Sequence, residues 1–417
     1  MITYSYSLSA TRYQGTRPSA AALTERPTSA VLSRDAPWHA RELGPTRAGM
    51  GRMTAGEQSV FPQGELPAVE RLQGALKTEW SRIAGAKEAA SKVSADLAGA
   101  LEKGRLVPAD TAVVGFGSLA RQEWTRGSDF DWTLLVDGQV SAEHLEVARS
   151  IRKLAKVLGH PEPGPTGIFG GLAFSHDIVH QIGGESDTNK NTTRRILLLF
   201  ESRNFGSGAP VRERVIRSVF RRYVGEDLRY RISEKPKSIP RFLLNDVVRY
   251  WRTMAVDFAG KRRERDEGWA LRNVKLRMSR KLLFSAALWG CLSCQLDPSA
   301  ALSASTTNPP EHDAELTKYL MGLSNKRPLD LLAEAFLKYG ALDSARRAFE
   351  AYNEFLGLLD DLDTRKVLQK LELTTASDNE TFRAAKDMAS QFQRSLNELF
   401  FETDDSLKKA AQLYGVF

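Results

Sequence analysis

The sequence predicts a small α/β unit followed by an all-helical half. Between residues 106 and 235, short apolar and β-branched runs that stop at glycine alternate with amphipathic segments, as strands and helices do in an α/β unit. From about residue 236 onward, apolar residues recur at helical spacing and only proline and glycine interrupt them. A chain of 417 residues is long enough for two or three such parts.

Composition and charge narrow the class of protein. The chain is 42% hydrophobic and 26% charged, which is typical of a globular protein. It has no apolar run that predicts a membrane span, no secretory signal, and only two cysteines, so we expect a cytoplasmic protein without a membrane partner. The net charge of +8 indicates either a polyanionic partner such as nucleotide or nucleic acid, or a basic surface without a partner.

The first 65 residues show no sustained hydrophobic periodicity. They are rich in Ser, Thr, Ala, Arg, Gly and Pro, which predicts a disordered arm. A gene start placed too early, with Met50 or Met53 as the true first residue, is an alternative, and a transit peptide is disfavoured by the acidic residues. Residues 66–105 are predicted to form N-terminal helices, the second over 86–103.

The elements of the α/β unit follow in order from local patterns. Strands are predicted at TAVVGFG (111–117), DFDWTLLVDG (129–138) and GIFGGLAFS (167–175). Helices are predicted at SLARQEWTR (118–126), with Ser118 as N-cap, at SAEHLEVARSIRKLAKVLG (141–159) and at TNKNTTRRILLLFESRNFG (188–206). The helical half, 236–417, is predicted to contain helices near 239–262, 269–295, 313–323, 328–338, 341–357, 362–373, 378–401 and 404–413.

Asp129 and Asp131 are candidate metal ligands. Side chains two residues apart on a strand point to the same face, so these carboxylates would lie side by side. Such a pair repels, and a hard cation such as Mg²⁺ removes the repulsion. Two ions about 4 Å apart are the arrangement of phosphoryl-transfer sites. The alternative is an ordinary Asp-x-Asp surface turn.

Gly117 and Ser118 are candidates for a phosphate cradle. They lie where the first strand turns into a helix, and free amides at a helix start bind phosphate. Glycine allows close approach of the backbone, the Ser118 hydroxyl can donate to phosphate, and Arg121 one turn later adds positive charge. The alternative is a turn followed by an ordinary N-cap.

The spacing from Gly117-Ser118 to Asp129 and Asp131 resembles the signature of the DNA polymerase β-like nucleotidyltransferase superfamily. The inner stretch ARQEWTRGSDFD is similar to the pattern of PII uridylyltransferases and glutamine synthetase adenylyltransferases. RRILLLFESRNFGS is similar to the apolar helix with a Glu-x-Arg step that follows the catalytic sheet of the uridylyltransferases. The resemblance covers roughly residues 110–225 and is only general beyond.

The resemblance implies a polymerase β-like α/β core with a small mixed sheet, followed by an all-helical C-terminal domain. It implies a nucleoside triphosphate as substrate and two Mg²⁺ ions, or Mn²⁺, as cofactor. Arg121 and Glu123 would form a supporting pair behind the site, and Ser128 would position the strand of the metal ligands. The predicted nucleotide-binding residues are Gly117, Ser118, Arg121, Ser128, Lys275 and Arg280.

A third carboxylate is usual in the superfamily, on a later strand, and this sequence does not fix its position. We predict Asp177 as the third catalytic carboxylate, with Glu162 and Asp187 as alternatives. Asp177 is equally compatible with the first turn of a helix. If no third carboxylate exists, catalysis would be weakened or absent.

The helical half offers cations and aromatic residues. By analogy with related nucleotidyltransferases, Lys275 and Arg280 would bind the triphosphate, being five residues apart and loosely on one side of a helix; a solvated basic face is the alternative. Tyr250 and Trp251 lie between arginines, where aromatic rings either stack on bases or pack the helix into the core.

Cysteine and histidine give no metal site in the sequence. Cys291 and Cys294 lack a second ligand pair and lie in an apolar helix, so we predict a core position. His176 and His180 would share a helix face, but a third ligand is missing.

Near the C-terminus, Tyr414 is a candidate nucleotide acceptor. The order of a catalytic α/β unit and a helical half is similar to that of Hailong-type phage-defence nucleotidyltransferases, which initiate DNA oligomers on a C-terminal tyrosine. The alternative is that Tyr414 packs the last helix.

These patterns predict an Mg²⁺-dependent nucleotidyltransferase that transfers NMP or dNMP from a nucleoside triphosphate to an acceptor hydroxyl of a protein or a nucleic-acid end. One form of this prediction is an antiviral oligonucleotide synthase primed on Tyr414. The alternatives are a degenerate nucleotide-sensing or scaffold protein and a toxin-like enzyme that modifies RNA.

Overall fold

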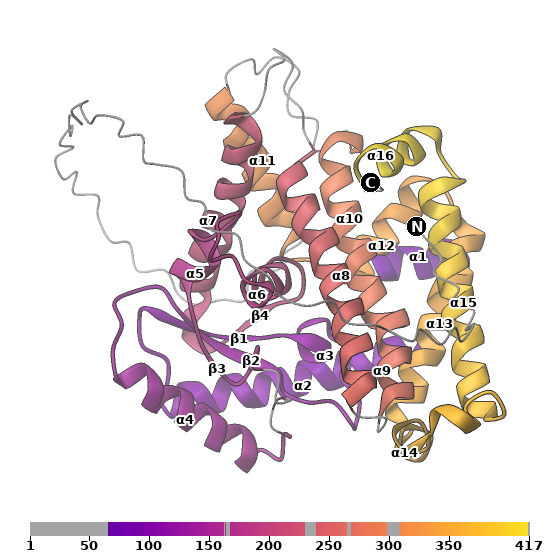
Figure 1. Cartoon of the computed structure of the whole chain (residues 1–417), viewed down its shortest axis with the longest axis horizontal. Helices are drawn as coiled ribbons and strands as arrows, with labels where there is room; N and C mark the ends of the chain where they lie inside the picture. Colours follow the sequence, from indigo (N-terminus) through magenta and orange to yellow (C-terminus); the bar gives the residue numbers. More distant parts are fainter. Residues whose placement is uncertain are drawn as a thin grey trace, which may run out of the picture. The chain divides into compact units, whose positions relative to one another are not determined.

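The strands of the α/β unit form a mixed sheet with the order β3-β2-β1-β4 (Figure 1). A computed structural model describes residues 66–161, 163, 167–229, 239–264, 268–297 and 309–415. Within these residues the strands are β1 (Thr111–Gly115), β2 (Trp132–Val136), β3 (Gly171–Phe174) and β4 (Arg203–Phe205). β1 pairs antiparallel with β2 and β4, and β2 pairs parallel with β3.

The pairing of β1 with β2 continues past both strands. Gly115 lies opposite Trp132. One residue further, the Phe116 N–H donates to the Asp131 carbonyl at 2.8 Å. Gly117 and Asp131 therefore lie together at one end of the two central strands, where β1 ends and β2 begins.

Helices cover both faces of the sheet. α2 (Ser81–Lys103) and α4 (Glu143–Val157) lie on one face and α7 (Ala209–Arg229) on the other (Figure 1). Both central strands are buried along their whole length, so successive side chains enter different cores. Val113 and Leu134 belong to the core under α2 and α4, whereas Val114 and Leu135 belong to the larger core shared with the helical half.

The N-terminal helices pack against helices far along the chain. The backbone N–H of Val69, in α1 (Ala68–Leu76), donates to Asp330 Oδ1 at 3.1 Å. At the start of α2, Asn353 Oδ1 accepts from the N–H groups of Arg82 and Ile83 at 3.0 and 3.2 Å. Both helices thus receive their N-terminal caps from the helical half.

The remaining elements complete the path of the chain. Those of the α/β unit are α3 (Gly117–Ala120), α5 (Ser175–Val179), α6 (Asn189–Phe200) and the 3₁₀ turn η1 (Gly206–Gly208). Those of the helical half are α8 (Arg241–Glu264), α9 (Trp269–Lys275), the π-helical η2 (Leu276–Arg280), α10 (Lys281–Leu296), α11 (Pro309–Leu323), α12 (Pro328–Lys338), α13 (Leu342–Asp360), α14 (Leu362–Lys370), η3 (Leu373–Thr375), α15 (Glu380–Phe401) and α16 (Asp405–Gly415).

The structure confirms an α/β unit with a small mixed sheet and a mostly helical remainder. It corrects several local predictions: β4 and α7 were not predicted, and the break between the first helices falls at Lys77, where a left-handed backbone (φ 49°) ends α1. Ser118 is not an N-cap, because the short α3 already begins at Gly117. The predictions for residues 1–65, Met50 and Met53 included, lie outside the described residues.

None of the helices in the described ranges combines the length and apolarity that crossing a bilayer requires.

Candidate functional site

The predicted carboxylate pair lies at the edge of the sheet, directly before β2. Asp129 is exposed, Phe130 is buried in the core, and Asp131 is half-buried. The alternation expected of a strand thus holds across these three residues, although β2 itself begins at Trp132. The two carboxylates are close enough for the charge of Asp129 to raise the pKa of Asp131.

Gly117 is required beside Asp131 for two reasons. Its φ of +65° lies in the left-handed region that favours glycine. A Cβ at this position would also lie 2.9 Å from Asp131 Oδ2. The absence of a side chain at Gly117 therefore leaves room for the Asp131 carboxylate.

Glu201 accepts a hydrogen bond from the Gly117 N–H, the group that we predicted would donate to a phosphate. The Gly117 N–H donates to Glu201 Oε1 at 3.0 Å, and Arg121 donates to Glu201 Oε2 at 2.6 Å. Arg280 lies 3.2 Å from Glu201 Oε1. Burial alone would raise the pKa of Glu201, but Arg121 and Arg280 hold it below its usual value.

Arg121 is held between two buried carboxylates. Its side chain is 7% exposed and is shared between Glu201 and Glu123, whose Oε2 lies 2.7 Å from Arg121 Nε. The Tyr352 hydroxyl donates to the same Glu123 oxygen at 2.9 Å. The Arg121–Glu123 pair implied by the family resemblance is present, and its arginine is also paired with Glu201.

Ser128 shapes the turn that leads into the carboxylates. Its hydroxyl oxygen accepts from the Thr125 N–H at 3.0 Å, and its own N–H donates to the Thr125 carbonyl at 2.9 Å. The side chain is buried in this turn. The hydroxyl is thus engaged in the turn that directly precedes Asp129.

Lys275 and Arg280 come together through the π-helical turn η2. In a π-helix the hydrogen bond joins residues five apart, so Lys275 and Arg280 fall on one face more closely than in an α-helix. The positive charges of both residues oppose the rise that burial causes in the pKa of Asp131. The structure thus brings the predicted phosphate-binding cations to the predicted metal ligands.

Burial shifts the pKa values of both Asp131 and Lys275. Burial raises the pKa of Asp131 to about 6, an effect that Arg280 opposes and Asp129 increases. Burial and then the charge of Arg365 lower the pKa of Lys275 to about 8. Perturbed groups of opposite charge that face one another beside a cavity are typical of functional sites.

Arg365 lies beside the candidate site and was not predicted from the sequence. It lies on α14, its side chain packs where a Cβ on Gly127 would be only 2.6 Å from its Cζ, and its charge acts on Asp129. No motif marks it, because it lies more than 230 residues beyond Asp129. Glu201 was likewise noted only as part of a helix-ending pattern.

A cavity of about 200 Å³ adjoins the cations. Lys275 and Arg280 line it together with the aromatic side chains of Phe169, Tyr250 and Phe258. Tyr250 is only 1% exposed, so it packs the core of α8 and at the same time closes the cavity. An apolar, aromatic wall with cations at one side is suited to a nucleoside with its phosphates.

Asp177 does not join the carboxylate pair. It lies in the first turn of α5, where Gln181 Nε2 donates to its Oδ1 at 3.2 Å. This is the helical alternative weighed for Asp177, and β3 itself carries no carboxylate. Glu162, one of the other candidates, lies outside the described residues.

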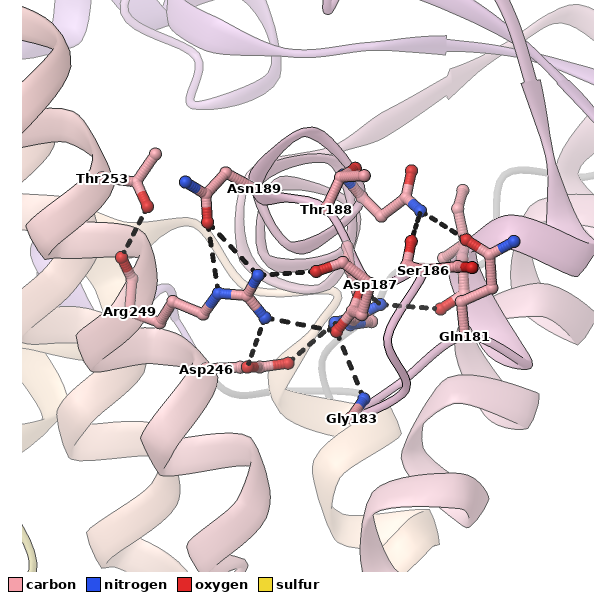
Figure 2. A network of polar contacts seen from close by, with 12 residues as sticks. Gln181, Gly183, Ser186, Asp187, Thr188, Asn189, Asp246, Arg249 and Thr253 are labelled. Atoms are coloured by element: carbon pink, nitrogen blue, oxygen red, sulfur yellow. Dashed lines mark hydrogen bonds and ion pairs between the residues drawn. The ribbon is translucent and has the colours of Figure 1, made fainter. Parts of the chain in front are cut away.

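Asp187 belongs to a separate buried network (Figure 2). Its Oδ2 lies 2.7 Å from Arg195 and 3.4 Å from Arg249, and the Arg249 guanidinium also reaches the Asp187 carbonyl at 2.6 Å. Asp246 pairs with Arg195 at 2.8 Å. These ion pairs join the start of α6 to α8, so Asp187 has a structural role.

The residues present fit a hard cation with two protein ligands. Asp129 and Asp131 supply carboxylate oxygens, and Mg²⁺ is commonly held by one or two carboxylates together with substrate phosphates and water. Among the described residues, no group of three or more His, Cys, Asp or Glu side chains is arranged to hold a metal ion. The pair would therefore bind such a cation weakly without a nucleotide.

Cys291 and Cys294 are buried in α10, as predicted, and form no disulfide. The rings of His176 and His180 lie 5.2 Å apart on and just after α5.

Tyr414 is not placed at the site. It lies on α16, which packs against α10 where a Cβ on Gly415 would be 3.3 Å from Leu288 Cδ1. Leu288 follows Arg280 by about 12 Å of helix. In Figure 1, α16 lies at the opposite end of α8 and α10 from α9 and α14.

Comparison of the chain with protein-family models, with curated proteins and with solved structures finds no match.

Proposed function

We propose that this chain is a metal-dependent nucleotidyltransferase. The observation that carries the proposal is the meeting of Asp129 and Asp131 with Lys275 and Arg280 beside an aromatic cavity. Carboxylates that hold a divalent cation and cations that hold phosphates are the two requirements for transfer from a nucleoside triphosphate. The substrate class is therefore a nucleoside triphosphate, with a hydroxyl of a protein or nucleic acid as acceptor.

Each residue has a defined part in the proposed reaction. Asp129 and Asp131 would hold Mg²⁺, which supplies charge neutralisation at the transferred phosphoryl group. Lys275 and Arg280 bind phosphate oxygens, while Glu201 keeps Arg280 and the Gly117 backbone in place. The acceptor oxygen bonds to the α-phosphorus, the bond from that phosphorus to the β-phosphate oxygen breaks, and pyrophosphate leaves. The hydroxyl proton passes to a carboxylate oxygen of the aspartate pair.

The test is pyrophosphate release by the full chain with Mg²⁺ and each NTP and dNTP, with oligonucleotides and total tRNA as added acceptors. We expect Asp129→Asn combined with Asp131→Asn to lower the rate about a hundredfold or more, the order of loss when electrostatic groups of an active site are removed. Asp363→Asn is the matched control, since that carboxylate is 91% exposed on α14. Equal rates in the double variant and the wild type would refute the proposal.

A nucleotide-binding protein without transfer activity is the second candidate. The observation in its favour is that neither Asp177 nor Asp187, the candidates within the described residues, joins Asp129 and Asp131. This candidate predicts Mg²⁺-dependent NTP binding by calorimetry, abolished in the same double variant, with no pyrophosphate release from any nucleotide.

A further inference from the structure

The corner between α13 and α14 packs onto the loop that precedes the carboxylates. The Arg126 N–H donates to Asp360 Oδ1 at 2.9 Å, and Arg126 Nε lies 3.3 Å from Asp360 Oδ2. At the next residue, Gly127, the chain leaves room for the Arg365 guanidinium. The corner between α13 and α14 therefore lies beside the loop that carries Asp129.

Arg365 is buried there without a partner. It is 8% exposed. Within the residues that the structure describes, its side chain makes no ion pair or hydrogen bond. Asp129 acts on it only at longer range. Burying an unpaired charge lowers the stability of the folded state by several kcal/mol. Stabilisation of the fold therefore does not explain why an arginine is buried at this position.

Lys275, at the end of α9, is half-buried. Its ammonium group makes no ion pair or hydrogen bond with the described residues, and Arg365 lies near enough to repel it. Arg280 differs, because Glu201 neutralises it at 3.2 Å. α9, which carries Lys275, packs against α14, which carries Arg365, so two cations without a bonded anion lie within reach of the charge of Asp129. Such a pair of cations is a suitable environment for an anionic ligand.

We infer that Arg365 and Lys275 form a binding site for a diphosphate group, and that Arg365 is a ligand of the pyrophosphate end of the nucleoside triphosphate. This inference rests on the proposed function. A guanidinium binds two phosphate oxygens at once, which suits a diphosphate better than a single ammonium does. Gly127 allows this contact, since any side chain there would displace Arg365.

A structural role and a ligand-binding role for Arg365 predict different effects of its removal on thermal stability. If Arg365 held α14 to the loop, its removal would lower the midpoint of thermal unfolding. As an unpaired ligand residue it opposes folding of the free protein, so Arg365→Met should leave that midpoint unchanged or raise it while weakening anion binding. The two readouts together separate the roles.

The experiment is calorimetric titration of the full chain with inorganic pyrophosphate in EDTA, so that no metal or turnover is needed. We expect saturable binding by the wild type and at least a tenfold weaker affinity for Arg365→Met. Lys366→Met is the matched control, because the neighbouring Lys366 is 66% exposed and should change the affinity less than twofold. Equal affinity of Arg365→Met and the wild type, or no saturable binding by the wild type, would overturn the inference.

Gly127→Ala provides a second variant, which keeps the arginine but pushes its guanidinium aside and should also weaken pyrophosphate at least tenfold. Titration with an α,β-methylene nucleoside triphosphate and with a nucleoside monophosphate separates a nucleotide ligand from free pyrophosphate. The triphosphate should lose affinity in Arg365→Met and the monophosphate should not; equal loss for both would overturn the assignment. Arg365-dependent pyrophosphate binding without any transfer activity would leave this inference standing and refute the proposed function.

Discussion

Asp131 and Glu201 are carboxylates at the same edge of the sheet, and their surroundings give them different chemistry. Glu201 is fully enclosed by two arginines and the Gly117 N–H, which keep it charged. Asp131 is half-buried, forms no direct ion pair with the described residues, and has Asp129 as a like-charged neighbour. One carboxylate is thus committed to the fold, while the other is available to a cation.

The pKa of Asp131 leads to a prediction on stability. Because burial raises that pKa from 3.8 to about 6, the protonated group stabilises the folded state at low pH, and this contribution is lost as the pH rises through 6. Between pH 5 and pH 8 the loss is about 1.4 kcal/mol for a shift of this size.

Asp131→Asn removes this titration. In EDTA, urea unfolding at pH 5 and pH 8 should show the variant gaining about 1.4 kcal/mol relative to the wild type on going from pH 5 to pH 8. Asp137→Asn, at the other end of β2, is the control and should not show that gain. Parallel pH profiles for Asp131→Asn and the wild type would contradict the environment described for Asp131.

At the level of single residues, the sequence predicted the groups that lie near one another in the motif. Gly117, Asp129 and Asp131 were found because the strand, turn and strand that carry them are consecutive and apolar. Arg365 was not found, since its role depends on contact between elements far apart in the chain. The enclosure of Arg121 by Glu201 and Glu123 was predicted only for Glu123, since Glu201 lies 80 residues further along the chain.

At the level of elements, η2 is a local irregularity with a consequence for the site. The π-helical turn interrupts an otherwise continuous run of helix from α9 to α10. It places Lys275 and Arg280 on one face toward Asp131. The sequence predicted a single helix over 269–295, because apolar periodicity does not distinguish one π-turn within a long helix.

Helix capping from a distance gives a prediction at this level. Asn353→Ala removes the acceptor of the Arg82 and Ile83 N–H groups and should lower the free energy of unfolding by about 1 kcal/mol, as loss of an N-cap does. Urea denaturation measures the change. Glu354→Ala, the exposed neighbour on α13, serves as control and should have little effect. Equal stabilities of the two variants would mean that Asn353 does not cap α2.

The helices of the helical half were predicted from the sequence, whereas α7 and the short strand β4 were not. α13 and α15 each have one apolar face, so their existence follows from local periodicity. α10 is apolar on all sides and buried from Leu282 to Cys294. β4 has three residues and pairs with β1 only after α6 has crossed the sheet. A strand of three residues has no recognisable hydrophobic pattern, and β4 is defined by its hydrogen bonds to β1.

At the scale of the whole molecule, the site is assembled from four separate parts of the chain. The loop before β2 carries the aspartates, and Glu201 directly follows α6. Lys275 ends α9, Arg280 ends the π-turn, and α14 carries Arg365. The caps that α12 and α13 give to α1 and α2 hold the first helices of the described chain against the helical half. The helical half is therefore part of the site and not an appended domain.

The most direct test of this account compares two labels on the same nucleotide. The full chain is incubated with Mg²⁺ and either α-³²P- or γ-³²P-labelled NTP or dNTP, and the products are separated on a protein gel and on a denaturing nucleic-acid gel. We predict that the α-label appears on protein or nucleic acid, that the γ-label appears only as pyrophosphate, and that both products are lost in Asp129→Asn with Asp131→Asn. Transfer of the γ-label to the acceptor, or α-label transfer that persists in the double variant, would contradict nucleotidyl transfer at this site.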